Sequence, residues 1–203
     1  MATMPPMSRT TQRRALMTRV ELRAQFPRQR PVGDALVFVI EGALSDECGT
    51  ITAGNMGDRP QGCIHTLATT HGATALVIIT GSTEPVTERR NAPPSEIFTL
   101  HALPWVERGP GVRRKLSWED KTGERVAFLA RFRAGHHAAP ASARGGELMF
   151  VIEGAAADEA GVVTTGNMHY RPHGCVHTVT TQHGATVLAV VWGRIELSEL
   201  AGS

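Results

Sequence analysis

The sequence predicts an all-β protein built from two tandem copies of a small barrel. Residues 33–81 and 145–193 align without a gap at an offset of 112 positions and are identical at 28 of 49 of them, so the chain carries a duplicated domain. Segments within each copy are short, rich in Val, Ile and Thr, and interrupted by Gly and Pro, as β-strands are. No window of about 12 residues shows a helical apolar stripe.

The composition sets limits on partners and location. The 203 residues include 21 Lys and Arg against 19 Asp and Glu, so no overall charge favours nucleic acid or a membrane surface as a partner. No run of about 18 apolar residues predicts a transmembrane helix. The first residues have no apolar signal segment, and three cysteines are too few for a disulfide framework. We therefore expect a cytoplasmic protein. The predominance of Arg over Lys is typical of a GC-rich bacterial genome.

The duplication also sets the expected boundaries. Residues 10–82 form the N-terminal repeat, whose first strand at 15–22 aligns with residues 127–134 of the second copy. Residues 83–103 are rich in Pro, Gly and charge, which predicts a linker with one short strand. The C-terminal repeat occupies residues 104–198.

Each repeat contains the pattern Gly-x5-Pro-x-Gly-x2-His. Its residues are Gly166, Pro172, Gly174 and His177 in the C-terminal copy, and Gly54, Pro60, Gly62 and His65 in the N-terminal copy. This pattern resembles the second motif of the cupin superfamily, in which Asn stands at the places of Thr181 and Thr69. The lead-in at residues 104–132 is similar to that of the ChrR-like cupins, named for a zinc-dependent anti-sigma factor. The resemblance implies two cupin barrels of the double-stranded β-helix, or jelly-roll, type.

The first cupin motif, Gly-x5-His-x-His-x3-Glu-x6-Gly, is only partly present. The C-terminal repeat places Gly135, Ala141, Ala143, Glu147 and Gly154 at its five positions. The N-terminal repeat places Arg23, Gln29, Pro31, Ala35 and Gly42 there. The second copy therefore keeps the Glu of the motif but neither His. The first copy keeps none of these three residues, so its site is degenerate.

The resemblance implies a metal site whose ligand set is incomplete here. In metal-binding cupins, both His of the first motif, its Glu and the His of the second motif hold one divalent ion. Residues i and i+2 of a strand share a face, which is why His-x-His supplies two ligands together. Only Glu147 and His177 remain in the C-terminal barrel, and His65 alone remains in the other. We expect either one divalent ion (Zn, Fe, Mn, Ni or Cu) in the C-terminal barrel or none, and none in the N-terminal barrel.

Two interpretations of His177 stay open at this stage. It is either a metal ligand or an interior histidine paired with Glu147, and a histidine held by a carboxylate can act as a general base without metal. His136 and His137 could replace lost ligands only if the loop rearranged, because Pro140 separates them from Ala141.

Three further residues are candidates for the substrate pocket. Cys175 stands two positions before His177 and would share its face of a regular strand, although packing alone also explains a small buried Cys. Tyr170 and Arg171 lie on the neighbouring strand on opposite faces, so one of the two faces lines the pocket.

The resemblance implies an enzyme of the oxygenase, isomerase or cyclase type, acting on a small carbonyl-containing or polyketide-like molecule. Glu147 and His177 are then the catalytic pair in the C-terminal barrel. The alternative is a non-catalytic ChrR-like ligand sensor or regulatory cupin. Because dimers are common among cupins, we expect a homodimer.

Overall fold

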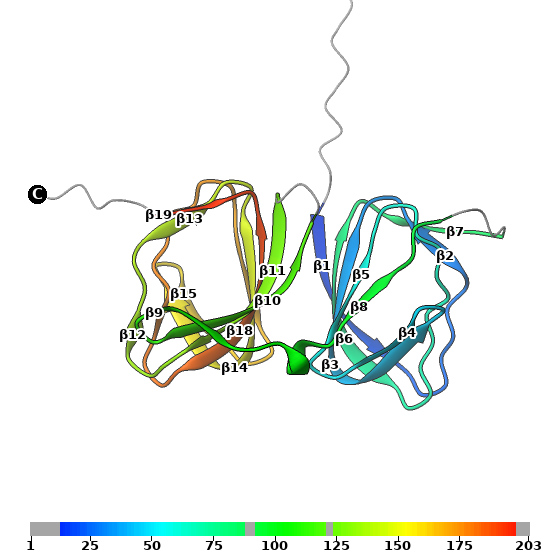
Figure 1. The fold of residues 1–203 in the computed structure, drawn as a ribbon, viewed down its shortest axis with the longest axis horizontal. Coiled ribbons are helices and arrows are strands. Elements are labelled where there is room, and N and C mark those ends of the chain that lie inside the picture. Colours follow the sequence, from blue (N-terminus) through cyan, green and yellow to red (C-terminus); the bar gives the residue numbers. More distant parts are fainter. Residues whose placement is uncertain (1–12, 88–91, 121–123, 198–203) are drawn as a thin grey trace, which may run out of the picture. The chain divides into compact units, whose positions relative to one another are not determined.

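The chain folds into two β-rich units, Met1–His101 and Ala102–Ser203 (Figure 1). The computed structural model describes residues 13–87, 92–120 and 124–197. Within these residues the only helix is η1, one 3-10 turn at Leu100–Ala102. No helix in the described part of the chain is long and apolar enough to cross a membrane. The all-β prediction with two tandem domains is confirmed.

In the N-terminal unit, one curled sheet has the strand order β1-β6-β3-β5-β8, with β4 paired to β3. Its strands are β1 (Arg13–Val20), β3 (Ala35–Asp46), β4 (Gly49–Thr52), β5 (Met56–Arg59), β6 (Ala73–Thr80) and β8 (Glu96–Phe98). A separate two-stranded ladder joins β2 (Gln29–Pro31) to β7 (Thr83–Pro85).

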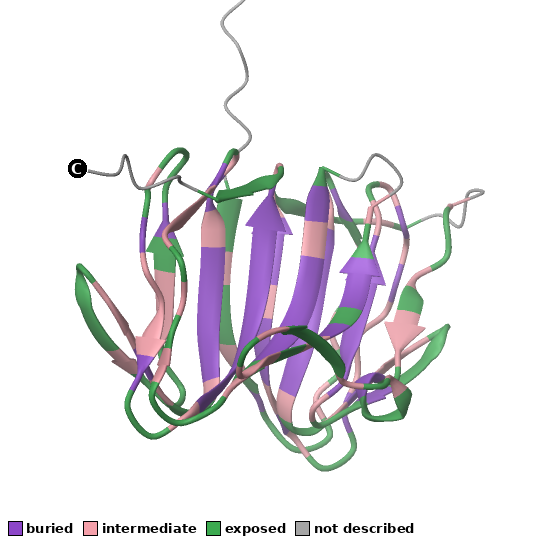
Figure 2. Cartoon of the chain, turned by 60° about the vertical axis from the view of Figure 1, so that its left-hand side comes forward, coloured by how far each residue is buried: buried purple, intermediate pink, exposed green. Residues whose placement is uncertain are grey.

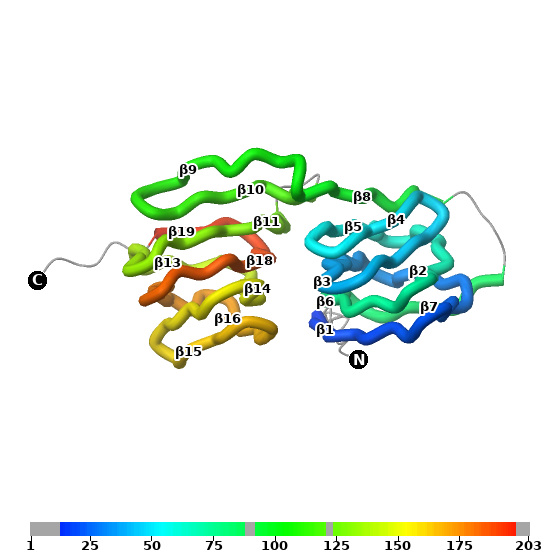
Figure 3. The backbone as a smooth tube through the Cα atoms, turned by 90° about the horizontal axis from the view of Figure 1, so that it is seen from below, coloured from blue at the N-terminus to red at the C-terminus, as the bar shows by residue number. Residues whose placement is uncertain are grey.

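The C-terminal unit repeats this plan with additional strands. Its main sheet runs β12-β17-β14-β18-β11-β10-β9, with β15 and β16 also paired to β14, and a second ladder joins β13 to β19. Its strands are β9 (Val106–Gly109), β10 (Val112–Glu119), β11 (Arg125–Phe132), β12 (His136–His137), β13 (Ala141–Ala143), β14 (Glu147–Asp158), β15 (Gly161–Thr164), β16 (Met168–Arg171), β17 (Thr180–Thr181), β18 (Ala185–Trp192) and β19 (Ile195–Leu197). Figure 3 shows β9 and β10 side by side at one edge, next to β11.

The duplication read from the sequence is reproduced strand by strand. Seven strands of the first unit have a counterpart in the second whose bounds are shifted by 112 residues: β1 and β11, β2 and β13, β3 and β14, β4 and β15, β5 and β16, β6 and β18, and β7 and β19. The β9–β10 hairpin lacks a counterpart in the described part of the first unit. The two repeats therefore share one barrel plan, and the hairpin distinguishes the second.

The segment 83–103, expected to be a linker, is part of the N-terminal unit. Its strand β7 pairs with β2, and its strand β8 pairs with β5 at the edge of the main sheet. The division between the units falls after His101. The correction has a physical reason. Prolines are tolerated in short edge strands, where a missing N–H breaks no interior ladder, so a Pro-rich stretch can still pair.

The longest strand of each unit bends in the middle, and this bend closes the barrel. In β14 the register with β18 shifts between Val151 and Glu153, which marks a β-bulge. Gly154 follows with φ of +81°, and a Cβ there would meet the carbonyl oxygen of Gly184. The first half of β14 pairs with β16 and β18, and the second half pairs with β15 and β17. The single strand β14 therefore belongs to both layers of the barrel.

Apolar side chains fill the interior of each unit. Figure 2 shows buried residues along the strands and exposed residues in the loops. In the C-terminal unit, β18 is buried along its whole length. A core cluster around it contains Phe128, Met149, Val151, Val187, Ala189 and Val191. In the N-terminal unit, Val37, Val39, Leu44 and Ile51 form the corresponding cluster.

In each unit, a buried ion pair joins the last residue of the bent strand to the last residue of a neighbouring strand, β16 in the C-terminal unit and β5 in the N-terminal unit. In the C-terminal unit the Arg171 guanidinium contacts Asp158, with Nε 2.9 Å and Nη2 2.7 Å from Oδ2, and both side chains are almost fully buried. In the N-terminal unit Arg59 Nη2 lies 2.9 Å from Oδ2 of Asp46, and that pair is equally buried. Burial alone would raise the pKa of Asp158, but the Ala160 N–H and the guanidinium lower it.

We expect Asp158→Asn to destabilise the C-terminal unit by about 3–5 kcal/mol, because it leaves a buried guanidinium without its carboxylate. The matched control is Glu196→Gln, which breaks the exposed Arg144–Glu196 pair of the same unit and should cost less than about 1 kcal/mol. Urea unfolding followed by tryptophan fluorescence measures both, since all three tryptophans lie in this unit. Equal losses in the two variants would contradict a structural role for the buried pair.

Candidate active site in the C-terminal barrel

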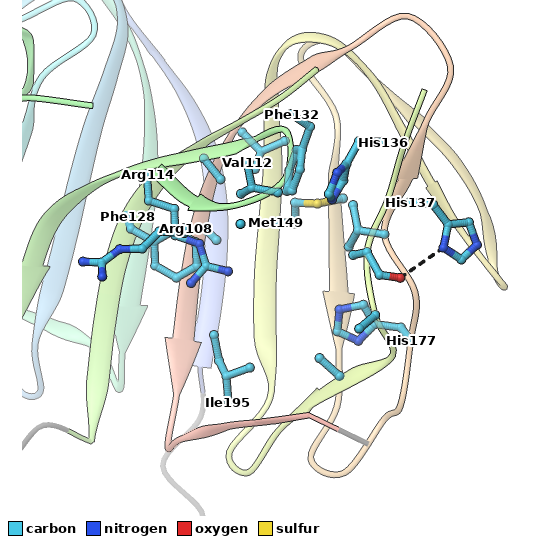
Figure 4. Close-up of a pocket in the computed structure, with 18 of the residues that line it drawn as sticks. Arg108, Val112, Arg114, Phe128, Phe132, His136, His137, Met149, His177 and Ile195 are labelled. Atoms are coloured by element: carbon cyan, nitrogen blue, oxygen red, sulfur yellow. Dashed lines mark hydrogen bonds between the residues drawn. The ribbon is translucent and has the colours of Figure 1, made fainter. Parts of the chain in front are cut away.

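A cavity of about 380 Å³ occupies the interior of the C-terminal barrel. Its walls are mostly apolar and come from β10, β11, β14, β18 and the β13–β19 ladder. Figure 4 shows Arg108 and Arg114 on one side of the cavity and three histidines, His136, His137 and His177, on the other. The cavity is therefore an apolar chamber with charged or titratable groups on two facing walls.

Glu147 and His177 form a direct pair in this cavity. Glu147 opens β14, and its Oε2 lies 3.3 Å from His177 Nε2. The histidine is fixed by two backbone hydrogen bonds of 2.9 Å with Ala141. Both side chains are largely buried.

The hydrogen bonds of His177 orient its Nε2 toward the carboxylate of Glu147. His177 Nδ1 donates to the carbonyl oxygen of Cys175 at 3.3 Å, so the Nδ1 position carries a hydrogen. A neutral ring would then turn the lone pair of Nε2 toward the carboxylate, and two acceptors would face each other. One proton between Nε2 and Oε2 removes this conflict. Such a pair can accept a proton from a substrate and return it.

Behind Glu147 lies the buried Arg171. Its Nη1 is 4.0 Å from Glu147 Oε1, while its Nε and Nη2 are bound to Asp158. His169 adds a third contact to the same aspartate, with Nδ1 3.1 Å from Oδ2. Arg171 therefore supports the carboxylate of Glu147 from outside the cavity.

The opposite wall is basic. Arg114 of β10 lies over the Phe128 ring, 4.4 Å from its centroid, and its Nε is buried without a hydrogen-bond partner among the described residues. Burial lowers the pKa of Arg114, an effect that Glu147 opposes and Arg108 reinforces. A desolvated guanidinium stacked on a ring is suited to bind the oxygen atoms of an anion.

His136 presents a further unpaired group. Its ring stacks on Phe132 with a centroid distance of 5.1 Å, and its Nε2 is buried without a partner among the described residues. Burial lowers the pKa of His136, although a hydrogen bond to the backbone of Pro110 acts in the opposite direction. The ring is therefore mostly neutral at pH 7 and offers a polar contact to an occupant of the cavity.

A family model for the ChrR Cupin-like domain matches this sequence twice, at residues 3–84 and 94–195. The chain belongs to this family. The two matches coincide with the two barrels, and the resemblance read from the motifs is confirmed. No curated protein matches the sequence.

Solved structures of similar fold match nearly the whole of this chain at low sequence identity. Salicylate 1,2-dioxygenase from Pseudaminobacter salicylatoxidans is 16% identical with a TM-score of 0.72, over 91% of this chain and 74% of that one. Oxalate decarboxylase from Bacillus subtilis is 14% identical with a TM-score of 0.69, over 93% and 71%. A dioxygenase candidate from Nostoc punctiforme is 14% identical with a TM-score of 0.75, over 94% and 71%. These likenesses establish the fold.

The metal centre implied by this cupin family does not fit the residues present. Ala141 and Ala143 occupy the two first-motif histidine positions, and neither carries a donor atom. In the described residues no three His, Cys, Asp or Glu side chains converge as a metal site would require. Glu147 and His177 alone supply two ligands, fewer than the three protein ligands of catalytic zinc sites.

The structure corrects three of the predicted pocket residues of this cupin. Tyr170, Arg171 and Cys175 are absent from the cavity lining. Tyr170 is 48% exposed because strand alternation turns it outward, and the same alternation turns Arg171 inward onto Asp158. Cys175 lies in the irregular turn before His177, so the assumed i, i+2 strand geometry does not hold and its Sγ approaches the Val176 carbonyl instead.

Sequence reasoning missed Arg108, Arg114 and Asp158. The two arginines come from the β9–β10 hairpin, which the duplicated sequence does not cover, so the repeat comparison gave no information on them. The sequence did contain a pattern from which Asp158 could have been identified. The spacing of 13 residues between Asp and Arg is the same in both copies, at 46 and 59 and at 158 and 171.

The N-terminal barrel has a different pair at the equivalent place. Gln29 Nε2 lies 3.3 Å from His65 Nε2, and Cys63 Sγ lies 3.6 Å from His65 Nδ1. Burial, reinforced by Arg59, lowers the pKa of His65 from 6.5 to about 4. An amide N–H therefore meets a neutral imidazole where the other barrel has a carboxylate.

We expect the N-terminal unit to lose up to about 3 kcal/mol of stability as the pH falls from 6.5 to 4. The unfolded chain binds a proton at His65 below pH 6.5, whereas the folded chain resists it until about pH 4, so acid favours unfolding across this window. NMR titration of the His65 ring and urea unfolding at several pH values measure the effect. His65→Gln should flatten the pH dependence, and a ring that titrates at 6.5 or above would contradict it.

Proposed function

We propose that the C-terminal barrel binds a small carbonyl compound bearing a carboxylate and catalyses a proton transfer on it, as an isomerase does. The observation that carries the proposal is the 3.3 Å contact between Glu147 Oε2 and His177 Nε2, two largely buried groups that face a mostly apolar cavity. Arg114 and Arg108 on the facing wall suit a carboxylate or the oxyanion of an enolate. Phe128 and Met149 supply apolar surface between them.

The chemistry follows from the residues present. The basic atom of the Glu147–His177 pair removes a proton from the carbon next to the carbonyl group. The electron pair of that C–H bond forms the enolate C=C bond, and the electron pair of the carbonyl bond moves onto its oxygen. Arg114 stabilises that oxygen, and the same pair returns the proton to carbon. No electrons leave or enter, so the step needs no oxidant. Oxygenase chemistry, another of the enzymatic options that the resemblance implies, has less support because two of the four expected ligand positions, 141 and 143, hold alanine.

Hydrogen–deuterium exchange on 4-phenyl-2-oxobutanoate, a one-ring keto acid, tests the catalytic pair. We expect the protein to accelerate exchange at C3 in D2O, followed by ¹H NMR. Glu147→Gln and His177→Asn should each lower the rate by about 10²–10⁴, the usual contribution of general acid–base catalysis. His65→Gln, in the other barrel, is the matched control and should leave the rate unchanged.

The outcomes also separate an enzyme from a regulatory cupin. Exchange that persists in both variants would show that the pair is not catalytic. Tight binding of the keto acid without exchange would favour the alternative, a ligand sensor that uses the same cavity. Calorimetric titration of the unaltered protein supplies the binding measurement.

Arg114→Met tests recognition of the carboxylate. We expect affinity for the keto acid to fall about tenfold to a hundredfold, the loss of one hydrogen bond to a charged group. Arg113→Met is the matched control on the same strand, because Arg113 is exposed and paired with Glu107. Equal affinities in the two variants would place the carboxylate elsewhere.

A further inference from the structure

The N-terminal barrel has a cavity of its own, of about 260 Å³. Its walls are mostly apolar, with contributions from β1, β2, β3, β5, β6 and β7. A 150 Å³ apolar cavity in a protein is large enough to hold benzene. This cavity therefore has room for one ring with a short substituent.

Arg59 brings unsatisfied donors to this cavity. The side chain lines the cavity, is 2% exposed, and is bound to Asp46 through Nη2. Its Nε and Nη1 are buried and have no hydrogen-bond partner among the described residues. Buried N–H groups without acceptors are costly, so these two donors favour an occupant with an acceptor oxygen.

Comparison with the other barrel indicates a position for such an oxygen. In the C-terminal barrel, Glu147 places an oxygen 4.0 Å from Nη1 of Arg171, the counterpart of Arg59. The counterpart of Glu147 is Ala35, which also lines the N-terminal cavity and has no polar atom on its side chain. An oxygen of a bound molecule can take the place that the carboxylate occupies in the second repeat.

The charges around the cavity determine the class of that molecule. Arg59 is already neutralised by Asp46, and no other Arg, Lys, Asp or Glu is among the described residues that line the cavity. His65 accepts a hydrogen bond from the Gln29 amide and is neutral at pH 7, so it does not supply a second positive charge. A bound carboxylate would be buried without a counter-ion, which is costly. A neutral carbonyl oxygen avoids this cost.

We propose that the N-terminal barrel is a second ligand site, selective for an uncharged one-ring carbonyl compound whose oxygen accepts from Arg59. The two barrels of one chain then differ in the charge of what they bind. This inference does not depend on the proposed function of the C-terminal barrel, because it takes from that barrel only the position of an oxygen and not its activity.

Three probes of similar size test the proposal on the full-length protein: acetophenone, ethylbenzene, which lacks the acceptor, and benzoate, which is charged. Amide ¹H–¹⁵N correlation spectra report which barrel responds. We expect acetophenone to shift amides of β2, β5 and β6 with an affinity about tenfold above that of ethylbenzene. Benzoate should leave these amides unshifted.

A cavity-filling variant tests whether acetophenone binds inside the N-terminal cavity. Ala75 lines the cavity, and its counterpart Val187 shows that the fold accepts valine there. Ala75→Val should weaken acetophenone at least threefold, whereas Ala189→Val, in the C-terminal cavity, should leave the β2, β5 and β6 shifts intact. If Ala75→Val fails to fold, the three probes still decide the question in the unaltered protein.

Several outcomes would overturn the proposal. Acetophenone that shifts only C-terminal amides, or none at millimolar concentration, would show that the N-terminal cavity is not a site for this class. Benzoate binding there as tightly as acetophenone would show that the site does not select uncharged compounds. Ethylbenzene binding equally well would show that Arg59 gives no hydrogen bond to the occupant.

Discussion

The buried ion pair between the end of the long bent strand and its neighbouring strand is the contact on which the rest of each barrel depends. Asp158 is the last residue of β14, whereas Arg171 of β16 lies opposite Glu147, the first residue of β14. The bulge and Gly154 must therefore bend the twelve-residue strand before Asp158 can reach Arg171. Once formed, it holds two layers together and places a guanidinium behind Glu147. A buried charge pair contributes little net stability, but breaking one partner is costly, which makes it a constraint on geometry.

Most of the fold could be predicted from the sequence, because a gapless repeat shifts every strand by the same number of residues. Strand composition and the glycines of the cupin motifs then identified the barrel. Pairing in the segment 83–103 could not be predicted, since edge strands such as β7 and β8 obtain their partners from the folded sheet rather than from their own composition.

The site was predictable only where a motif named its residues. Glu147 and His177 stand at motif positions, and the structure brings them into contact. The positions of Tyr170 and Cys175 depend on which face of a strand turns inward and on where a turn replaces the strand, and neither follows from spacing. The role of Arg114 depends on a hairpin that packs on the barrel from outside the repeat, so no internal comparison could indicate it.

Duplication let the two cavities diverge in charge while the barrel stayed the same. Both barrels keep the Asp–Arg pair and the second-motif histidine. In one, the first-motif glutamate gives the histidine an acidic partner, and the added hairpin brings arginines to face them. In the other, alanine replaces the glutamate and Gln29 supplies a neutral partner, so His65 stays uncharged. There the Arg59 guanidinium keeps two N–H donors that have no partner among the described residues. The partner of the second-motif histidine, Glu147 in one barrel and Gln29 in the other, thus distinguishes a carboxylate–imidazole pair from a neutral hydrogen-bonding chamber.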